Sequence, residues 1–271
     1  MGNKQFNLPT PLRVSLHKQS LPPQAKITRK RQRSLSLLLL LLLSLFLTII
    51  TPSSLFASFA SSRFNSSLQT AQTLNEQGRQ QLEQGDAEAA LNTWKQAELA
   101  YQKAKDENGV IGSKLNQSQA LQALGRYRLA EQLLEQLRKS LETQPNSELK
   151  ATVYRSLGDI LRVNGDLNKS ETILEASLKL ALSLNATPAV IATQLSLGNT
   201  AFAQLKRAQS VNDLQRAEVE SKKAVNFYRS AIAQVTSPQI KLQAQLNLLN
   251  LLIETKQLSE AEKIWPEVRQ A

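Results

Sequence analysis

The side chains that most often carry chemistry are scarce in this sequence. The 271 residues include no cysteine and a single histidine, His17. Thiolate nucleophiles, disulfides and cysteine-type zinc sites are therefore excluded, as is chemistry built on paired histidines. The carboxylates, lysines, serines and tyrosines form no matched pair, and there is no glycine-rich phosphate loop. We therefore expect a protein that is not an enzyme and that holds no cofactor and no metal ion.

The positive charge is concentrated near the N-terminus. The formal charge is +11, but eight of the 33 basic residues and none of the 22 acidic residues lie in residues 1–60. Residues 61–271 then hold 25 basic and 22 acidic residues, a balance that does not suit a surface for phosphate groups. We expect no nucleic-acid partner.

A long apolar run follows a basic cluster. Arg29–Arg33 precede Leu35–Ile50, in which 13 of the 16 residues are apolar. This order predicts a basic, disordered cytoplasmic tail over residues 1–34 and a membrane-targeting segment over residues 35–60. The remainder of the chain, residues 61–271, is then expected on the far side of the cytoplasmic membrane.

Two fates of the targeting segment fit the sequence. Ser58-Phe59-Ala60 places small residues where signal peptidase requires them, which predicts a signal peptide cleaved after Ala60. An uncleaved run that reaches Phe59 instead approaches the roughly 20 residues of a bilayer-spanning anchor. The chain is thus expected to be periplasmic or extracellular, or held at the membrane by a single N-terminal span.

The remainder of the chain repeats with a period of 40 residues. Gly85, Gly125 and Gly165 each lie between two segments with amphipathic helical spacing, and Leu205 occupies the next equivalent position. Fixed-period units of this kind cannot bury their apolar faces alone and stack on their neighbours. The period therefore predicts a helical solenoid.

The order of small and large residues within each unit resembles the tetratricopeptide repeat (TPR). The third unit shows it most fully, with Tyr154, Leu157-Gly158, Leu161, Ser170, Leu174 and Ser177 in sequence. The resemblance covers about three quarters of the chain and implies an all-α fold. That fold would be a right-handed superhelical solenoid of about five helical hairpins, here preceded by an N-terminal hydrophobic helix.

The fourth unit departs from the period. After Gly198 the small residue of the second helix is expected at position 210, but the matching residue is Ala224. We interpret these 14 extra residues as two added turns on each helix, which would form a protruding hairpin over Lys206–Ser221. A flexible loop is the alternative.

The resemblance also implies a binding role. In TPR arrays the first helix of each hairpin lines a concave groove, so we predict a non-enzymatic scaffold that binds a peptide or a protein partner there. The candidate groove residues are Arg79, Asn116, Gln119, Arg155, Asp159, Arg162, Asn199 and Asn250. Residues 35–60 would contact the membrane, and apolar residues of the last hairpin predict self-association through that end.

An alternative role follows from the length of the repeat. With its 40-residue period and its N-terminal export signal, the array is similar to those that precede CHAT (caspase-like) protease domains in cyanobacteria. The catalytic His and Cys of that domain have no counterpart here. The alternative is therefore the truncated regulatory or assembly region of a CHAT-type protease or signalling protein.

Overall fold

The computed structural model describes residues 53–270. The chain divides into two units, residues 1–57 and residues 58–271, and the description below concerns the second. The predicted tail and most of the predicted targeting segment lie outside the described residues, while Ser53–Ala60 form the first turns of a helix. Within residues 53–270, no helix combines the length and the apolar character that crossing a membrane requires. The N-terminal hydrophobic helix stays a prediction.

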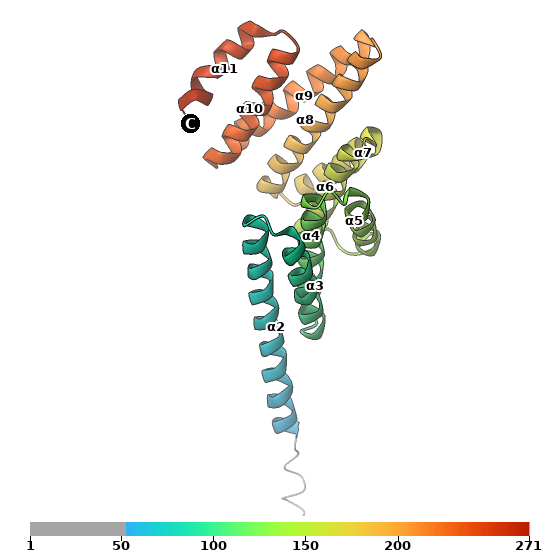
Figure 1. Ribbon diagram of the computed structural model, residues 1–271, viewed down its shortest axis with the longest axis vertical. Helices are drawn as coiled ribbons and strands as arrows, with labels where there is room; N and C mark the ends of the chain where they lie inside the picture. The colour runs from blue at the N-terminus through green and yellow to red at the C-terminus, as the bar shows by residue number, and fades with distance from the viewer. Residues whose placement is uncertain (1–52, 271) are drawn as a thin grey trace, which may run out of the picture. The chain divides into compact units, whose positions relative to one another are not determined.

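The described residues form ten α-helices and no strand, so the predicted all-α class is confirmed. Consecutive helices pair as five antiparallel hairpins, as Figure 1 shows. Their bounds are α2 Ser53–Glu83, α3 Ala87–Lys103, α4 Glu107–Ala123, α5 Tyr127–Leu141, α6 Glu148–Val163, α7 Leu167–Ser183, α8 Thr187–Ser210, α9 Leu214–Gln234, α10 Pro238–Glu254 and α11 Leu258–Gln270.

The turn inside each of the first three hairpins is built on the repeating glycine. Gly85, Gly125 and Gly165 have φ values of +86°, +70° and +84°, a left-handed conformation that a side chain disfavours. The following residue caps the next helix in the first hairpin, where Asp86 accepts a hydrogen bond of 3.0 Å from the backbone of Ala89. Asp166 stands at the same place in the third hairpin, but its carboxylate pairs with Lys169 at 2.7 Å.

A second glycine lets the two helices of a hairpin approach each other closely. A Cβ atom on Gly158 would lie 2.5 Å from Leu174, and one on Gly78 would lie 2.6 Å from the Trp94 ring. The Trp94 indole nitrogen also donates a hydrogen bond of 3.0 Å to the Asn75 carbonyl. The cost of glycine within a helix, about 1 kcal/mol, is offset by the burial of a large side chain.

The fourth hairpin is longer than the second, third and fifth hairpins. Helix α8 has 24 residues and α9 has 21, whereas α3, α4 and α7 each have 17. The close contact shifts accordingly, because Gly198 faces Tyr228, which lies 14 residues beyond the position that the period predicts. The two extra turns on each helix are confirmed, and the alternative of a flexible loop is wrong.

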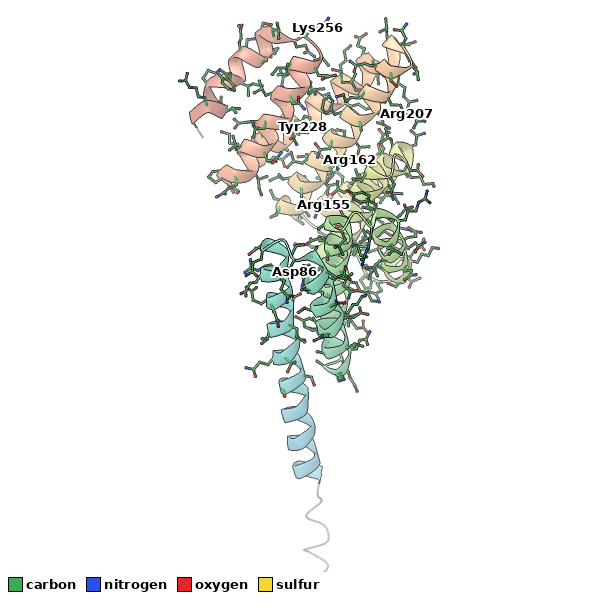
Figure 2. The ribbon with its side chains drawn as sticks, in the orientation of Figure 1. Asp86, Arg155, Arg162, Arg207, Tyr228 and Lys256 are labelled. Atoms are coloured by element: carbon green, nitrogen blue, oxygen red, sulfur yellow. The ribbon has the colours of Figure 1, made fainter. Side chains whose placement is uncertain are left out.

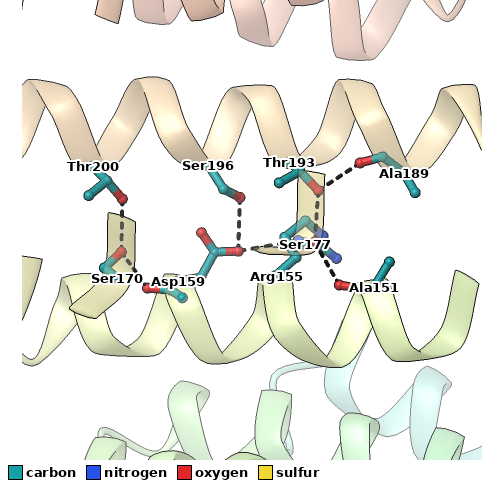
Figure 3. Close-up of polar contacts among 10 residues, drawn as sticks. Ala151, Arg155, Asp159, Ser170, Ser177, Ala189, Thr193, Ser196 and Thr200 are labelled. Carbon is teal, nitrogen blue, oxygen red and sulfur yellow. Dashed lines mark hydrogen bonds and ion pairs between the residues drawn. The ribbon is translucent and has the colours of Figure 1, made fainter. Parts of the chain in front are cut away.

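Helix α7 joins the third hairpin to the fourth through buried hydroxyl groups. Ser170 donates to the Gly158 carbonyl at 2.8 Å and lies 3.0 Å from the Thr200 hydroxyl. Ser177, two turns further along the same side of α7, repeats the arrangement. It donates to the Ala151 carbonyl at 2.8 Å and lies 3.2 Å from the Thr193 hydroxyl. Figure 3 shows these contacts between α6 and α8. Small polar residues thus keep these helices close while each of the four hydroxyls has a hydrogen-bond partner.

Candidate groove for a peptide partner

The first helices of successive hairpins line an open groove of about 1000 Å³, which we name the inner groove. Helices α4, α6, α8 and α10 and the linker between α9 and α10 contribute to it. Apolar residues, among them Pro188, Ile191, Leu195 and Ile240, form part of its surface. Its polar lining consists of Gln122, Arg155, Asp159, Arg162, Thr187, Ser196, Asn199, Gln234, Thr236, Ser237, Gln239, Gln243 and Asn247.

A carboxylate on α6 is fixed within this groove by neighbours on two helices. The Asp159 Oδ2 atom accepts a hydrogen bond of 3.2 Å from Arg155 and one of 3.1 Å from Ser196, which belongs to α8 (Figure 3). Burial raises the pKa of the Asp159 carboxyl above its ordinary value, and the charges of Arg155 and Arg162 only partly oppose this shift. Because Ser196 of α8 donates to the Asp159 carboxylate, the contact between α6 and α8 favours the ionised form of Asp159.

Arg162 supplies a positive charge that no carboxylate neutralises by direct contact. Its Nε atom is buried and has no hydrogen-bond partner, and within residues 53–270 it forms no ion pair. Figure 2 marks it together with Arg155, which lies seven residues earlier on the same side of α6. Two guanidinium groups thus share the groove with the single carboxylate of Asp159. An anionic group is the natural complement of this arrangement.

Oriented amide groups occupy the other wall of the groove. The Asn199 Oδ1 atom accepts hydrogen bonds from the Tyr228 hydroxyl at 2.8 Å and from the Asn247 amide at 3.1 Å. Gln243 in turn donates to Asn247 at 2.9 Å. Burial raises the pKa of Tyr228 well above its ordinary value, so its hydroxyl stays a donor. The Asn199 amide is thereby held with its own N–H groups available for a ligand carbonyl.

The lining continues toward the first hairpin in a smaller cavity of about 210 Å³. Asn116 and Gln119 lie there, and Arg155 lines both cavities. Asn116 donates a hydrogen bond of 2.7 Å to Asn75 of α2. Polar groups therefore follow one another along the first helices of the first four hairpins.

Six of the eight sequence-predicted groove residues line these two cavities, and two do not. Arg79 is exposed on α2, where it pairs with Glu76 and Glu83 of its own helix. Asn250 is exposed on α10 beyond the groove lining. The role of the other six in binding remains a prediction.

The sequence analysis missed the amides of α10 that do line the groove. Gln239, Gln243 and Asn247 recur at intervals of four after the helix start at Pro238. That spacing places them on one helical face, so the sequence contained the signal. As for metals, no three His, Cys, Asp or Glu side chains of residues 53–270 gather closely enough to hold an ion.

Comparison with solved structures identifies the architecture. A Podosopora anserina kinesin light chain with nearly identical TPR-like repeats is similar to this chain at a TM-score of 0.55 and 18% identity, over 73% of this chain and 92% of that one. The fold is a TPR-like helical solenoid. BtubC (BKLC) from P. vanneervenii gives a TM-score of 0.55 at 16% identity, covering 78% of this chain and 90% of its own.

A third TPR-like neighbour is the Rap protein complexed with Competence and Sporulation Factor. It aligns at a TM-score of 0.59 and 14% identity, over 81% of this chain and 58% of the Rap chain. This chain thus spans little more than half of that protein. The sequence itself matches no protein-family model and no curated protein at a significant level.

Proposed function

We propose that the chain is a protein-interaction scaffold whose inner groove binds a peptide segment carrying an acidic group. The observation that carries the proposal is the arrangement of Arg155 and Arg162 beside the oriented amides of Asn199 and Asn247. Guanidinium groups bind carboxylates with charge-assisted hydrogen bonds, and amide side chains bind peptide backbone. The Rap complex is consistent with this role, because a protein with a similar fold was solved together with a factor.

The groove favours an extended ligand. Its lining runs across four helices of successive hairpins and alternates aliphatic with polar side chains. An extended peptide presents backbone donors and acceptors along its whole length, which the amides can satisfy, while its apolar side chains contact residues such as Ile191 and Ile240. The acidic group would lie at Arg162, whose Nε atom is buried without a partner.

Fluorescence anisotropy with two labelled peptide pools tests the proposal. The pools have eight residues each and equal apolar content, but one contains Asp and Glu where the other contains Lys. The full chain should bind the acidic pool more tightly, and added salt should weaken that binding. Arg155→Glu with Arg162→Glu should reduce affinity for the acidic pool by at least about tenfold, since two charge-assisted contacts are lost.

A matched control changes the same net charge elsewhere. Arg207 and Arg216 are exposed near the turn between α8 and α9, outside the groove lining. Arg207→Glu with Arg216→Glu should leave affinity for the acidic pool unchanged. Because a glutamate at position 155 would face Asp159, the milder pair Arg155→Gln with Arg162→Gln should be measured as well. Equal binding by wild type and both groove variants would disprove the assignment.

We also propose, from the sequence pattern of residues 29–60, that the groove operates beyond the cytoplasmic membrane. Protease added outside spheroplasts should degrade a chain tagged at Ala271. Survival of that tag under conditions that degrade a periplasmic marker would contradict export. The kinship with arrays that precede CHAT domains, and the assembly role that it implies, stays a prediction.

A further inference from the structure

The last hairpin exposes a side chain that the other hairpins bury. Trp265 lies nine residues after the turn residue Lys256, just as Trp94, Leu134 and Leu174 lie nine residues after their turn glycines. Those three side chains are 0–1% exposed, whereas Trp265 is 53% exposed. The same position in the repeat therefore has two very different environments.

Two causes account for the exposure. Leu249 occupies the position that Gly158 holds in the third hairpin. Without a glycine at this position, α10 leaves no space for the Trp265 ring to pack against its backbone. In addition, the described residues contain no helix that packs on the far side of α10 and α11 (Figure 1). In the third hairpin that side is covered by α8, which contacts both α6 and α7.

The exposed apolar surface extends onto α10. Leu246 and Ile253 are 43% and 54% exposed, and their separation of seven residues places them on one side of the helix. They correspond to Arg155 and Arg162 of α6, which flank Asp159 where it contacts Ser196 of α8. Leu246, Ile253 and Trp265 thus lie on the side where a neighbouring hairpin packs elsewhere in the chain. We name this surface the distal face.

The opposite end of the solenoid does not complement the distal face. On α4, the side that meets the preceding hairpin is marked by Gly109 against Tyr101 and by Gln117 against Trp94. The positions 40 residues earlier on α2 are Gln69 and Gln77, both polar and exposed. Thr73 and Gln80 extend the same polar side. A head-to-tail contact would therefore bury amides against an apolar surface and leave them without partners.

A second copy of the distal face does complement it. Glu262 and Arg269 are exposed, and neither forms an ion pair within residues 53–270. They lie three residues before and four residues after Trp265, on the same side of α11. If two α11 helices pack antiparallel about a two-fold axis near Trp265, Glu262 lies opposite the partner's Arg269. The symmetry forms the same ion pair twice.

We propose that the distal face joins two copies of this chain in a symmetric dimer centred on Trp265. The apolar residues of α10 and α11 become buried, as Trp94, Leu134 and Leu174 already are at the position equivalent to Trp265. The two Glu262–Arg269 pairs fix the antiparallel orientation. Because each copy has one distal face, assembly stops at two.

Sedimentation equilibrium of the full chain in a mild detergent tests the contact. The wild type should dimerise, and Trp265→Glu should weaken dimerisation by at least tenfold. The matched control is Leu214→Glu at the turn between α8 and α9, where the leucine is also largely exposed, at 70%; it should leave dimerisation unchanged. Circular dichroism confirms that both variants are folded. A monomeric wild type, which would leave the face to a helix of another protein, overturns the proposal, as does a Trp265→Glu variant that associates like the wild type.

An exchange of charges tests the antiparallel orientation of the two α11 helices. This test remains possible even if Trp265→Glu fails to fold. Glu262→Arg alone and Arg269→Glu alone should each weaken the dimer, because each places like charges opposite one another at two symmetric sites. The double variant should restore wild-type association. Since the chain has no cysteine, a mixture of Glu262→Cys and Arg269→Cys chains should also crosslink on oxidation more readily than either chain alone. Failure of the double variant to recover, or crosslinking no better in the mixture, overturns the antiparallel arrangement.

Discussion

The third and fifth hairpins each place a large apolar residue at one equivalent position, Leu174 and Trp265, and bury it to different extents. In the third, Leu174 lies against Gly158 and is fully buried, with α7 joined to α8 by hydroxyl contacts on either side of it. In the fifth, Leu249 replaces the glycine, and the large residue Trp265 is half exposed. The comparison shows that a repeat position sets which side a residue faces. Its burial depends both on the facing residue of its own hairpin and on the neighbouring hairpin.

Truncation of the two large side chains is expected to give the greatest contrast. Leu174→Ala should lower the free energy of unfolding by about 2–5 kcal/mol, because it leaves a cavity between three helices. Trp265→Ala should cost no more than about 1 kcal/mol at protein concentrations too low for association, since solvent already reaches the ring. Urea unfolding followed by circular dichroism measures both. Equal losses would show that the two hairpins pack alike.

Filling the glycine position of the third hairpin should have the next largest effect. Gly158→Ala places a methyl group 2.5 Å from Leu174, and the overpacking should cost about 1–3 kcal/mol. Gly112 of α4 is the matched control, because a Cβ atom there meets nothing within 4 Å. Gly112→Ala should instead stabilise the chain by about 0.5–1 kcal/mol through helix propensity. Thermal unfolding of the two variants should therefore shift in opposite directions, and a shared direction would contradict the close crossing.

The smallest expected effect concerns Asp159, which is partly buried in the third hairpin and is replaced by exposed Asn250 in the fifth. The pKa of Asp159 is raised in the folded chain, so the folded state binds a proton more readily than the unfolded state. Its contribution to stability must then fall as pH rises from the ordinary carboxyl pKa, about 4, through the higher folded value. Asp159→Asn should remove this dependence, so that the variant gains stability relative to wild type between pH 4 and pH 7. Urea unfolding at both pH values measures the difference, and parallel profiles would contradict the raised pKa.

Much of the fold could be predicted from the sequence because its constraints are local. The turn glycines lie between helices, as their spacing predicts, and the contact between Gly198 and Tyr228 confirms the lengthened hairpin. These features depend on sterics within one hairpin. A single sequence therefore contains enough information to place them.

The groove was less predictable because its composition depends on how hairpins cross. Arg79 fitted the repeat register, yet carboxylates three residues before it and four residues after it on its own helix pair with it. The sequence register points to Asn250, whereas Asn247 lines the groove, because the register of α10 alone does not show where α8 crosses it. The contact between Asp159 and Ser196 likewise joins two hairpins. Such contacts follow from the angle between units, which the period does not contain.

The lengthened fourth hairpin shows that the size of a unit and its place in the stack can vary independently. Counted from the contact between Gly198 and Tyr228 to the turn residue Asn212, each arm is seven residues longer than in the third hairpin, about two helical turns. The side chains that meet the neighbouring hairpins therefore stay on the same helical faces. At the apex, Val211 and Leu214 are 71% and 70% exposed, and all of residues 211–216 are exposed. Further pairs of seven-residue segments could lengthen the same arms without altering the crossings below. The apex is therefore the place in this solenoid where a fluorescent reporter or an added domain would disturb the array least.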